Sequence, residues 1–123
     1  MKITLLGTGS PIPDPMRAGP CTLVQAGGEN VMVDCGRGAL MRLMAAGVFP
    51  GMVSTCLVTH LHSDHITDLN DLVTSRWVMM PVTVPLRVIG PPGIRSVVDA
   101  MLQMLSPDQQ YRPDHHDYLR ATR

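Results

Sequence analysis

The sequence predicts an α/β layered fold, because short apolar runs alternate with stretches of helical periodicity along most of its length. Runs typical of buried strands are KITLL (2–6), STCLVTH (54–60) and LRVIG (86–90). Between and after them, apolar residues recur every three or four positions, which is the spacing of one helix face. With 123 residues, 45% of them hydrophobic and 16% charged, the chain has the size and composition of one globular domain.

The first part of the chain is expected to contain three strands and a helix. The first strand ends at GTGSPIPDP, which holds too much glycine and proline for a regular element. CTLVQA (21–26) and NVMVD (30–34) follow as strands, with a hairpin turn at 27–30 between them. A helix is predicted around 38–46, and Gly47 is placed to end it.

The second part continues the alternation of strands and helices. After the strand at 54–60, one amphipathic helix is predicted from 66 to 80, ended by the following proline. After the strand at 86–90, the motif PPG opens a helix over 94–105 that ends before a further proline. Residues 106–123 are polar, turn-rich and aperiodic, so they are predicted to form a polar tail. Neither an internal repeat nor an interdomain linker is recognisable, so the whole chain is expected to form one unit.

Composition narrows the classes of function. The formal net charge is zero, so no overall field attracts nucleic acid or an anionic membrane surface. No apolar run approaches the ~20 residues of a membrane span, and the first residues do not resemble a signal peptide. Cys21, Cys35 and Cys56 are odd in number and lack CxxC spacing, which indicates neither a disulfide framework nor a thiolate zinc site. A reducing, cytoplasmic location without membrane contact is expected.

The most informative stretch is VTHLHSDHI, in which His60, His62, Asp64 and His65 fall within six positions. Zinc binds neutral imidazole nitrogens and carboxylate oxygens. His60 and His62 alternate by two at the end of a strand, so both side chains are expected on one side. Asp64 and His65 follow at the start of the next helix, where the chain has turned toward a neighbouring point. The pattern predicts two adjacent metals, one for each pair.

Each of these residues has a simpler interpretation when it is taken alone. Asp64 or Ser63 could be a helix N-cap, and His60 could be a strand-end residue with a satisfied ring. Four ligand-type residues in six positions, at a strand-to-helix junction, have no such economical explanation. The spacing therefore favours metal binding.

The same residues carry a resemblance to a known family. HLHSDH (60–65) matches the HxHxDH signature of the metallo-β-lactamase fold, whose complete form is an αββα sandwich. ITLLGTGSP, VMVDCGRG and RVIGPPGI, in this order and spacing, resemble the ribonuclease Z branch of that family. ITDLNDLVTSRW (66–77) resembles a subgroup labelled ribonuclease Z or arylsulfatase-like. The resemblance covers nearly the whole chain and implies that residues 1–123 supply about the N-terminal half of the sandwich.

The resemblance implies a role for each candidate residue. In the family, the residues matching His60 and His62 bind one zinc ion, and those matching Asp64 and His65 bind a second. Asp34 would support the ligands from behind, the alternative being a plain turn residue. Asp64 would also help to manage the proton of the attacking water. The implied reaction is endonucleolytic cleavage of a phosphodiester at the 3′ end of precursor tRNA.

The chain departs from the family pattern in its second half. The complete family site has three further ligands, a histidine for each metal and a bridging aspartate, which would fall beyond Arg123. The other histidines are His115 and His116, and their segment PDHHDY is expected to be solvated and not to supply the missing ligands. Half of a sandwich leaves an apolar sheet face open. This predicts that the chain associates with itself, as a homodimer or other homo-oligomer, or with another polypeptide; the alternative is that the chain is a fragment or a truncated product.

Two other functions stay open at this point. One is a related hydrolase of sulfate, carboxyl or cyclic phosphate esters. The other is a catalytically inactive chain that binds metal or only associates. With one Trp, one Phe and two Tyr, the chain has no aromatic platform that would argue directly for RNA binding.

Overall fold

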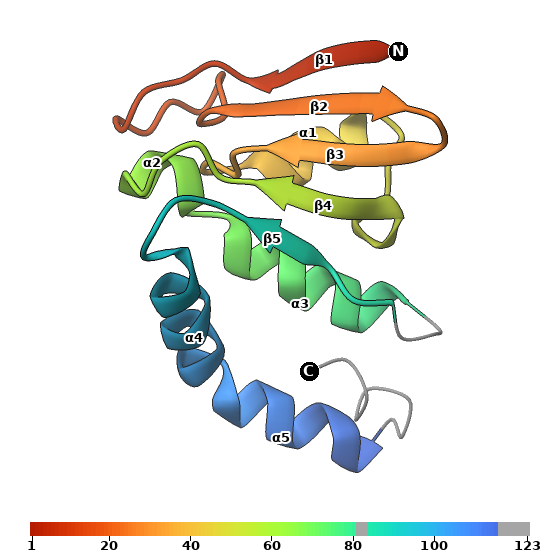
Figure 1. Cartoon of the computed structure of the whole chain (residues 1–123), viewed down its shortest axis with the longest axis vertical. Helices are drawn as coiled ribbons and strands as arrows, with labels where there is room; N and C mark the ends of the chain where they lie inside the picture. Colours follow the sequence, from red (N-terminus) through yellow and green to blue (C-terminus); the bar gives the residue numbers. More distant parts are fainter. Residues whose placement is uncertain (81–83, 116–123) are drawn as a thin grey trace.

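The computed structural model describes residues 1–80 and 84–115, with side chains up to residue 111. A five-stranded sheet with the order β1-β2-β3-β4-β5 forms its centre (Figure 1). β1 to β3 pair antiparallel, whereas β3 to β5 pair parallel. The predicted α/β fold class is confirmed. The strands are β1 (Lys2–Gly7), β2 (Cys21–Ala26), β3 (Glu29–Val33), β4 (Val53–Leu57) and β5 (Arg87–Ile89).

The hairpin between β2 and β3 closes through a two-residue turn, as predicted. Gly27 and Gly28 have φ angles of 56° and 78°. A turn of this length needs left-handed backbone at both positions, and glycine adopts it without a steric cost. The turn sets the register that pairs Ala26 with Glu29 and Leu23 with Met32.

Helix α1 (Ala39–Ala45) connects β3 to β4 and ends as predicted at Gly47. Gly47 has φ 81°, and its N–H donates to the carbonyl of Met44 at 3.0 Å. The N–H of Val48 donates to the carbonyl of Leu43 at 3.2 Å. This pair of bonds is the Schellman ending that glycine favours. A short 3₁₀ helix (Pro50–Met52) then leads into β4.

The single helix predicted from 66 to 80 is two helices, so that prediction is wrong in this respect. The structure has α2 (Ser63–Ile66) and α3 (Leu69–Met79), with a break at Thr67 and Asp68. The backbone N–H of Asp68 donates to the carbonyl of Cys35 at 2.9 Å, so it does not continue the α2 ladder. The contact with the segment after β3 overrides the local periodicity.

The prediction that residues 106–123 are turn-rich and aperiodic is wrong over the first ten residues, which form helix α5 (Ser106–His115) directly after α4 (Ile94–Met104). The prediction treats Pro107 as a stop. Proline is, however, favoured in the first turn of a helix, where its missing N–H is not needed. Asp108 adds negative charge in that turn, which suits the helix N-terminus. The rest of the predicted tail, with His116, lies outside the described residues, as do the side chains of Asp114 and His115.

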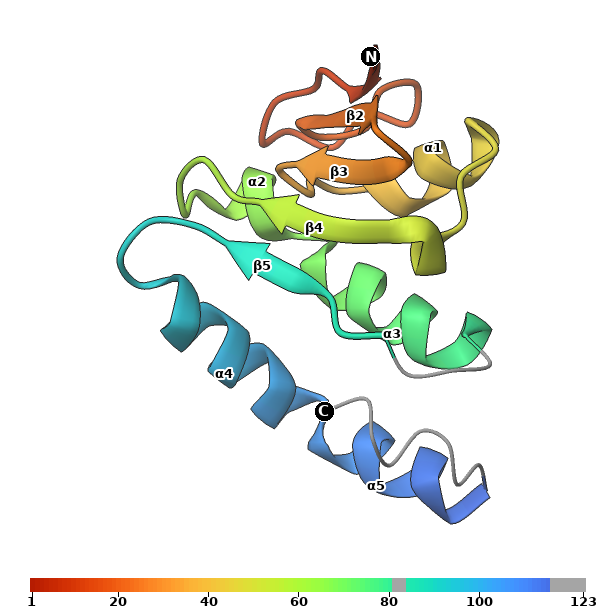
Figure 2. The same ribbon diagram turned by 45° about the vertical axis from the view of Figure 1, so that its right-hand side comes forward.

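The two faces of the sheet differ. Helices α1 and α3 lie on one face, and α4 and α5 continue beyond the edge strand β5 (Figures 1 and 2). The covered face carries Leu23, Met32 and Cys56, all fully buried. The opposite face carries the apolar residues Ile3, Leu5, Val24, Val31, Leu57 and Ile89. By register, Val24 pairs with Ile3 and with Val31, and Leu57 pairs with Ile89, whereas Leu5 pairs with Thr22. Four of these are exposed: Ile3 (59%), Leu5 (67%), Leu57 (36%) and Ile89 (45%).

A buried arginine links α3 to the sheet. Arg76 is 4% exposed, and its guanidinium donates to three backbone carbonyls. These belong to Pro50 at 3.1 Å, Val53 at 2.5 Å and Val84 at 2.6 Å. Burial lowers the pKa of the Arg76 side chain. The fork of donors thus ties α3 to the start of β4 and to the segment before β5.

Within the described ranges, no helix combines the length and apolar character needed to cross a membrane.

Candidate metal centre

The four candidate ligands lie in the connection between β4 and α3, past the carboxyl end of the parallel strands. The strand prediction of 54–60 is too long, because β4 ends at Leu57 and His60 lies three residues further on. The N–H of Val58 donates to the carbonyl of Ile89 at 2.8 Å, so this connection is held to β5. Ligand sites in open α/β sheets form at this end of the strands.

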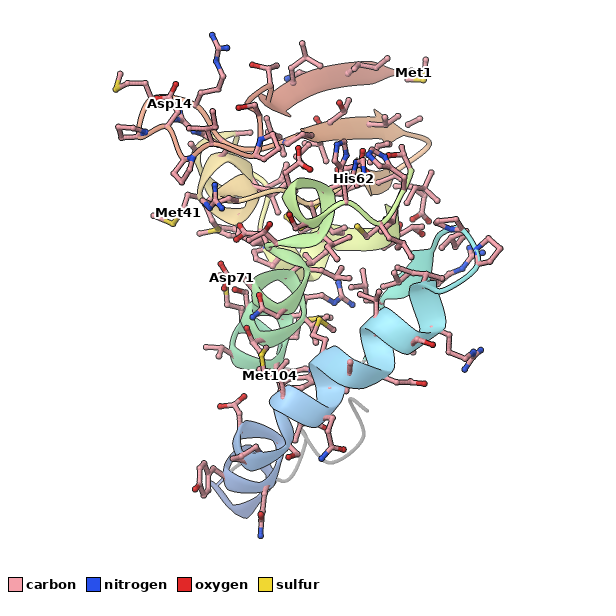
Figure 3. The ribbon with its side chains drawn as sticks, turned by 90° about the vertical axis from the view of Figure 1, so that its left-hand side faces the viewer. Met1, Asp14, Met41, His62, Asp71 and Met104 are labelled. Atoms are coloured by element: carbon pink, nitrogen blue, oxygen red, sulfur yellow. The ribbon has the colours of Figure 1, made fainter. Side chains whose placement is uncertain are left out.

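The structure brings the three histidine rings together. The ring centroids of His60 and His62 are 4.7 Å apart in an edge contact, and those of His60 and His65 are 4.0 Å apart. Asp64 Oδ2 lies 3.7 Å from His65 Nε2. Figure 3 labels His62 among nitrogen-bearing side chains gathered beside α2. All four residues therefore face one small region.

Asp34 lies behind this cluster and contacts it directly. It follows the last residue of β3, is 6% exposed, and has φ 63°, the only positive value among the described non-glycine residues. Its Oδ2 is 2.8 Å from His65 Nδ1. Its Oδ1 accepts the backbone N–H of Thr59 at 2.8 Å. Left-handed backbone is costly for a residue with a side chain, and such strain concentrates at functional sites.

The segment after β3 is joined to α2 at several points. The N–H of Cys35 donates to the carbonyl of His65 at 2.8 Å. A Cβ on Gly36 would lie 2.6 Å from the carbonyl oxygen of Asp64 and 2.5 Å from the backbone of Gly19. Only glycine allows so close an approach of three backbone segments. Gly36 thus lets the turn that carries Asp64 pack against the segment that carries Asp34.

Asp68 is a structural carboxylate that the sequence analysis missed. Its Oδ2 accepts the N–H of Leu40 at 3.1 Å and so caps the first turn of α1, where Gly38 offers no side chain. Burial raises the pKa of Asp68, while backbone hydrogen bonds from Leu40, Gly38 and Ala39 oppose the rise. The signal in the sequence was that helix α1 starts after Gly38, which has no side chain to cap it, so that a capping group from elsewhere in the chain was needed.

The cysteines do not belong to the cluster. All three are free and buried, which agrees with the expectation of no disulfide framework. Burial raises the pKa of the Cys21 thiol to about 12. The pKa of Cys35 is raised by its hydrogen bond with Cys56 and by burial. Thiols in this state are poor metal ligands, because the ligand form is the thiolate.

The donor chemistry of the cluster fits a divalent metal, but the ligand number is low. Imidazole nitrogens backed by a buried carboxylate are the pattern of zinc ligands. Within residues 1–80 and 84–115, no group of three or more His, Cys, Asp or Glu side chains is placed to hold one ion. A stable zinc site at this cluster would therefore need further donors.

Comparison with family models identifies the family to which this chain belongs. Residues 1–92 match the family model described as Anti-Pycsar protein Apyc1. The chain belongs to this family.

Curated relatives of this family member are named ribonuclease Z. The chain is 56% identical to ribonuclease Z of Mycolicibacterium gilvum over 121 residues, covering 97% of this chain and 42% of that protein. It is 56% identical to ribonuclease Z of Mycobacterium avium over 123 residues, covering 98% and 44%. The chain spans less than half the length of the curated relatives it matches. The resemblance to the N-terminal portion of ribonuclease Z is confirmed.

Solved structures agree with the fold. Human tRNase Z, short form, superposes with a TM-score of 0.74 at 29% identity, over 88% of this chain and 39% of that one. The metallo-β-lactamase fold protein YhfI from Bacillus subtilis superposes with a TM-score of 0.63 at 27% identity, over 72% and 37%. The predicted metallo-β-lactamase fold class is confirmed, with this chain as its N-terminal portion.

Proposed function

We propose that this chain is the N-terminal portion of a zinc-dependent hydrolase of the ribonuclease Z type, which cleaves precursor tRNA at its 3′ end. The observation that carries the proposal is the gathering of three imidazoles and Asp64 at the carboxyl end of the parallel strands, in contact with Asp34. The names of the curated relatives support an RNA substrate, and the name of the superposed human tRNase Z supports tRNA.

Each residue has a stated part in this proposal. His60 and His62 would hold one zinc ion, and Asp64 and His65 the second. Bound zinc supplies Lewis-acid activation of water and of the phosphodiester. Asp34 holds the Nδ1 side of His65, so that Nε2 faces outward. Asp64, through Oδ2, would accept the proton of the attacking water.

The remaining parts of the site would come from outside the described chain. With two ligands for each metal, each ion has open positions, which a further protein segment would fill. The open sheet face supports association with a second chain, and we propose a homo-oligomer. A reducing compartment such as the cytoplasm is supported by three free, buried thiols.

A hydrolase of smaller sulfate, carboxyl or cyclic phosphate esters is the second candidate. The matching family model is described as an anti-Pycsar protein and not as a ribonuclease, so the family match does not single out an RNA substrate and leaves this candidate open. The two candidates share the metal centre and differ in substrate. Turnover of precursor tRNA and of a panel of such esters by one preparation separates them.

Metal content is the direct test. Purified chain is analysed for zinc by elemental analysis, together with its mass in solution. We expect bound zinc in the parent chain and a sharp loss in His62→Ala. His116→Ala is the matched control, because it also removes one imidazole but lies outside the motif. Zinc that persists in His62→Ala but disappears in His116→Ala contradicts the assignment. Hydrolysis of the esters but not of precursor tRNA by the loaded chain favours the second candidate.

A further inference from the structure

We propose that Thr59 is a positioning residue for His60: its hydroxyl connects Asp34 to the imidazole, so that one buried carboxylate orients two histidines. The residue precedes the histidine motif and is not itself a candidate ligand. Its role toward metal rests on the proposed function, whereas its effect on the His60 ring does not.

The contacts around Thr59 are short and form a chain. Its Oγ1 lies 2.8 Å from Asp34 Oδ2 and 3.0 Å from Oδ1. The same oxygen lies 2.9 Å from His60 Nδ1. On the other side, Asp34 Oδ2 is 2.8 Å from His65 Nδ1. Asp34 thus reaches His65 directly and His60 through one hydroxyl.

The direction of each hydrogen bond follows from the groups involved. An ionised carboxylate has no hydrogen to donate, so the Thr59 hydroxyl donates to Asp34. That hydroxyl has one hydrogen, and its oxygen can then only accept from the ring, so Nδ1 of His60 carries the proton. His65 donates from Nδ1 to Asp34 for the same reason. In the neutral form of each ring, Nε2 then carries no proton and is available to a ligand.

The Thr59 hydroxyl does more than complete the contacts of Asp34. That carboxylate already accepts the N–H of Thr59 and the ring of His65. The hydroxyl is the group that reaches His60. The β-branched side chain of Thr59 has restricted χ1 freedom, which keeps Oγ1 between Asp34 and His60. In protein metal sites, a hydrogen-bond partner of this kind holds the ring nitrogen that does not bind the metal.

His62 provides an internal control. Within the described part of the chain, its ring has the edge contact with His60 and no hydrogen bond of its own. Removal of the Thr59 hydroxyl is expected to change His60 and to leave His62 and His65 as they are.

The test uses the ¹⁵N-labelled, metal-free chain and long-range ¹H–¹⁵N NMR of the imidazoles, at a pH of about 8, which is above the ordinary pKa of histidine. We expect His60 and His65 in the Nδ1–H form. In Thr59→Val, which keeps the shape of the side chain, His60 should shift to a mixture of the two neutral forms while His65 is unchanged. Thr59→Ser should restore the Nδ1–H form of His60. A parent-like His60 signal in Thr59→Val overturns the proposal; Thr59→Ala replaces the valine variant if the latter does not fold.

A second readout is zinc affinity by competition with a chelating dye. Loss of such an orienting partner weakens metal binding by roughly 10-fold or more, so Thr59→Val should weaken zinc by that factor and Thr59→Ser should not. Thr67→Val is the matched control, because its hydroxyl donates to the Ser63 carbonyl and to no ring. A change in the His60 form without zinc binding by any variant supports the role of Thr59 and contradicts the proposed function. Equal zinc loss in Thr67→Val shows a general structural effect and overturns the role of Thr59 toward metal.

Discussion

The two faces of the sheet carry similar apolar residues, but these residues are buried on one face and largely exposed on the other. Leu23 on the covered face is fully buried, whereas Leu5 on the open face, one strand away, is 67% exposed. Both are leucines in strands whose side chains alternate between the two faces of the sheet, so residue type alone does not distinguish the buried position from the exposed one. Only the helices over one face make the difference.

The comparison shows where the stability of the described chain comes from. α1 and α3 cover one face, and their buried side chains form a core with that face. The histidine cluster lies at the end of the strands, and it depends on the segments after β3 and β4 for its shape. The open face contributes little burial here, so it is available for another surface.

The largest effect is expected from Leu23→Ala. Removal of a fully buried leucine leaves a cavity in the covered face, which costs about 2–5 kcal/mol. Urea unfolding followed by circular dichroism measures the loss in the free energy of unfolding. A change below about 1 kcal/mol, the usual range for substitutions outside a core, would contradict the assignment of this face as the core.

A smaller loss is expected from Arg76→Met, which keeps most of the side-chain volume on the covered side. Three carbonyls would lose their donor, at a cost of about 2 kcal/mol. Arg87→Met is the control, because Arg87 is exposed on β5. Urea unfolding of both variants is measured in the same way. Equal losses in the free energy of unfolding would contradict the role of Arg76 in tying α3 to the sheet.

The thiols provide a test that depends on pH. Because the folded-state pKa of Cys21 is about 12 against an ordinary 9.0, folded chain keeps this thiol protonated where unfolded chain does not. The unfolded state then binds fewer protons, so stability is retained below pH 9.0 and falls as the pH rises from there toward about 12.

At a pH of about 8, iodoacetamide should label the folded chain slowly and the chain in guanidinium at all three cysteines. Rapid labelling of folded chain would show that the covered face is open.

The smallest effect on stability is expected from Leu5→Ala. The side chain is largely exposed, so the free energy of unfolding should change by no more than about 0.5 kcal/mol. Self-association, measured by sedimentation, should weaken, because the substitution removes apolar area from the open face. A loss as large as that of Leu23→Ala would mean that the open face is covered within the single chain.

Local pattern predicted most elements, and it failed where distant segments decide the outcome. The strands, the turn at Gly27-Gly28 and the end of α1 at Gly47 follow from residue types within a few positions. The division between α2 and α3 depends on the bond from Asp68 to Cys35, which is remote in sequence. The start of α5 at Ser106 was readable in principle, because serine followed by proline and aspartate is a helix-start pattern.

The sequence by itself determined the order of the strands, most of the helices and the ligand-type residues of the candidate site, because periodicity and residue chemistry are local properties. Only the tertiary structure decided which sheet face is buried and which atoms of Asp34 and Thr59 contact the histidine rings. Asp34 is 31 positions from His65 and 25 from Thr59, and their contacts exist because parallel pairing of β3 with β4 brings the ends of both strands together. A hydrogen bond across that distance depends on how the chain is packed, and spacing in the sequence does not report it.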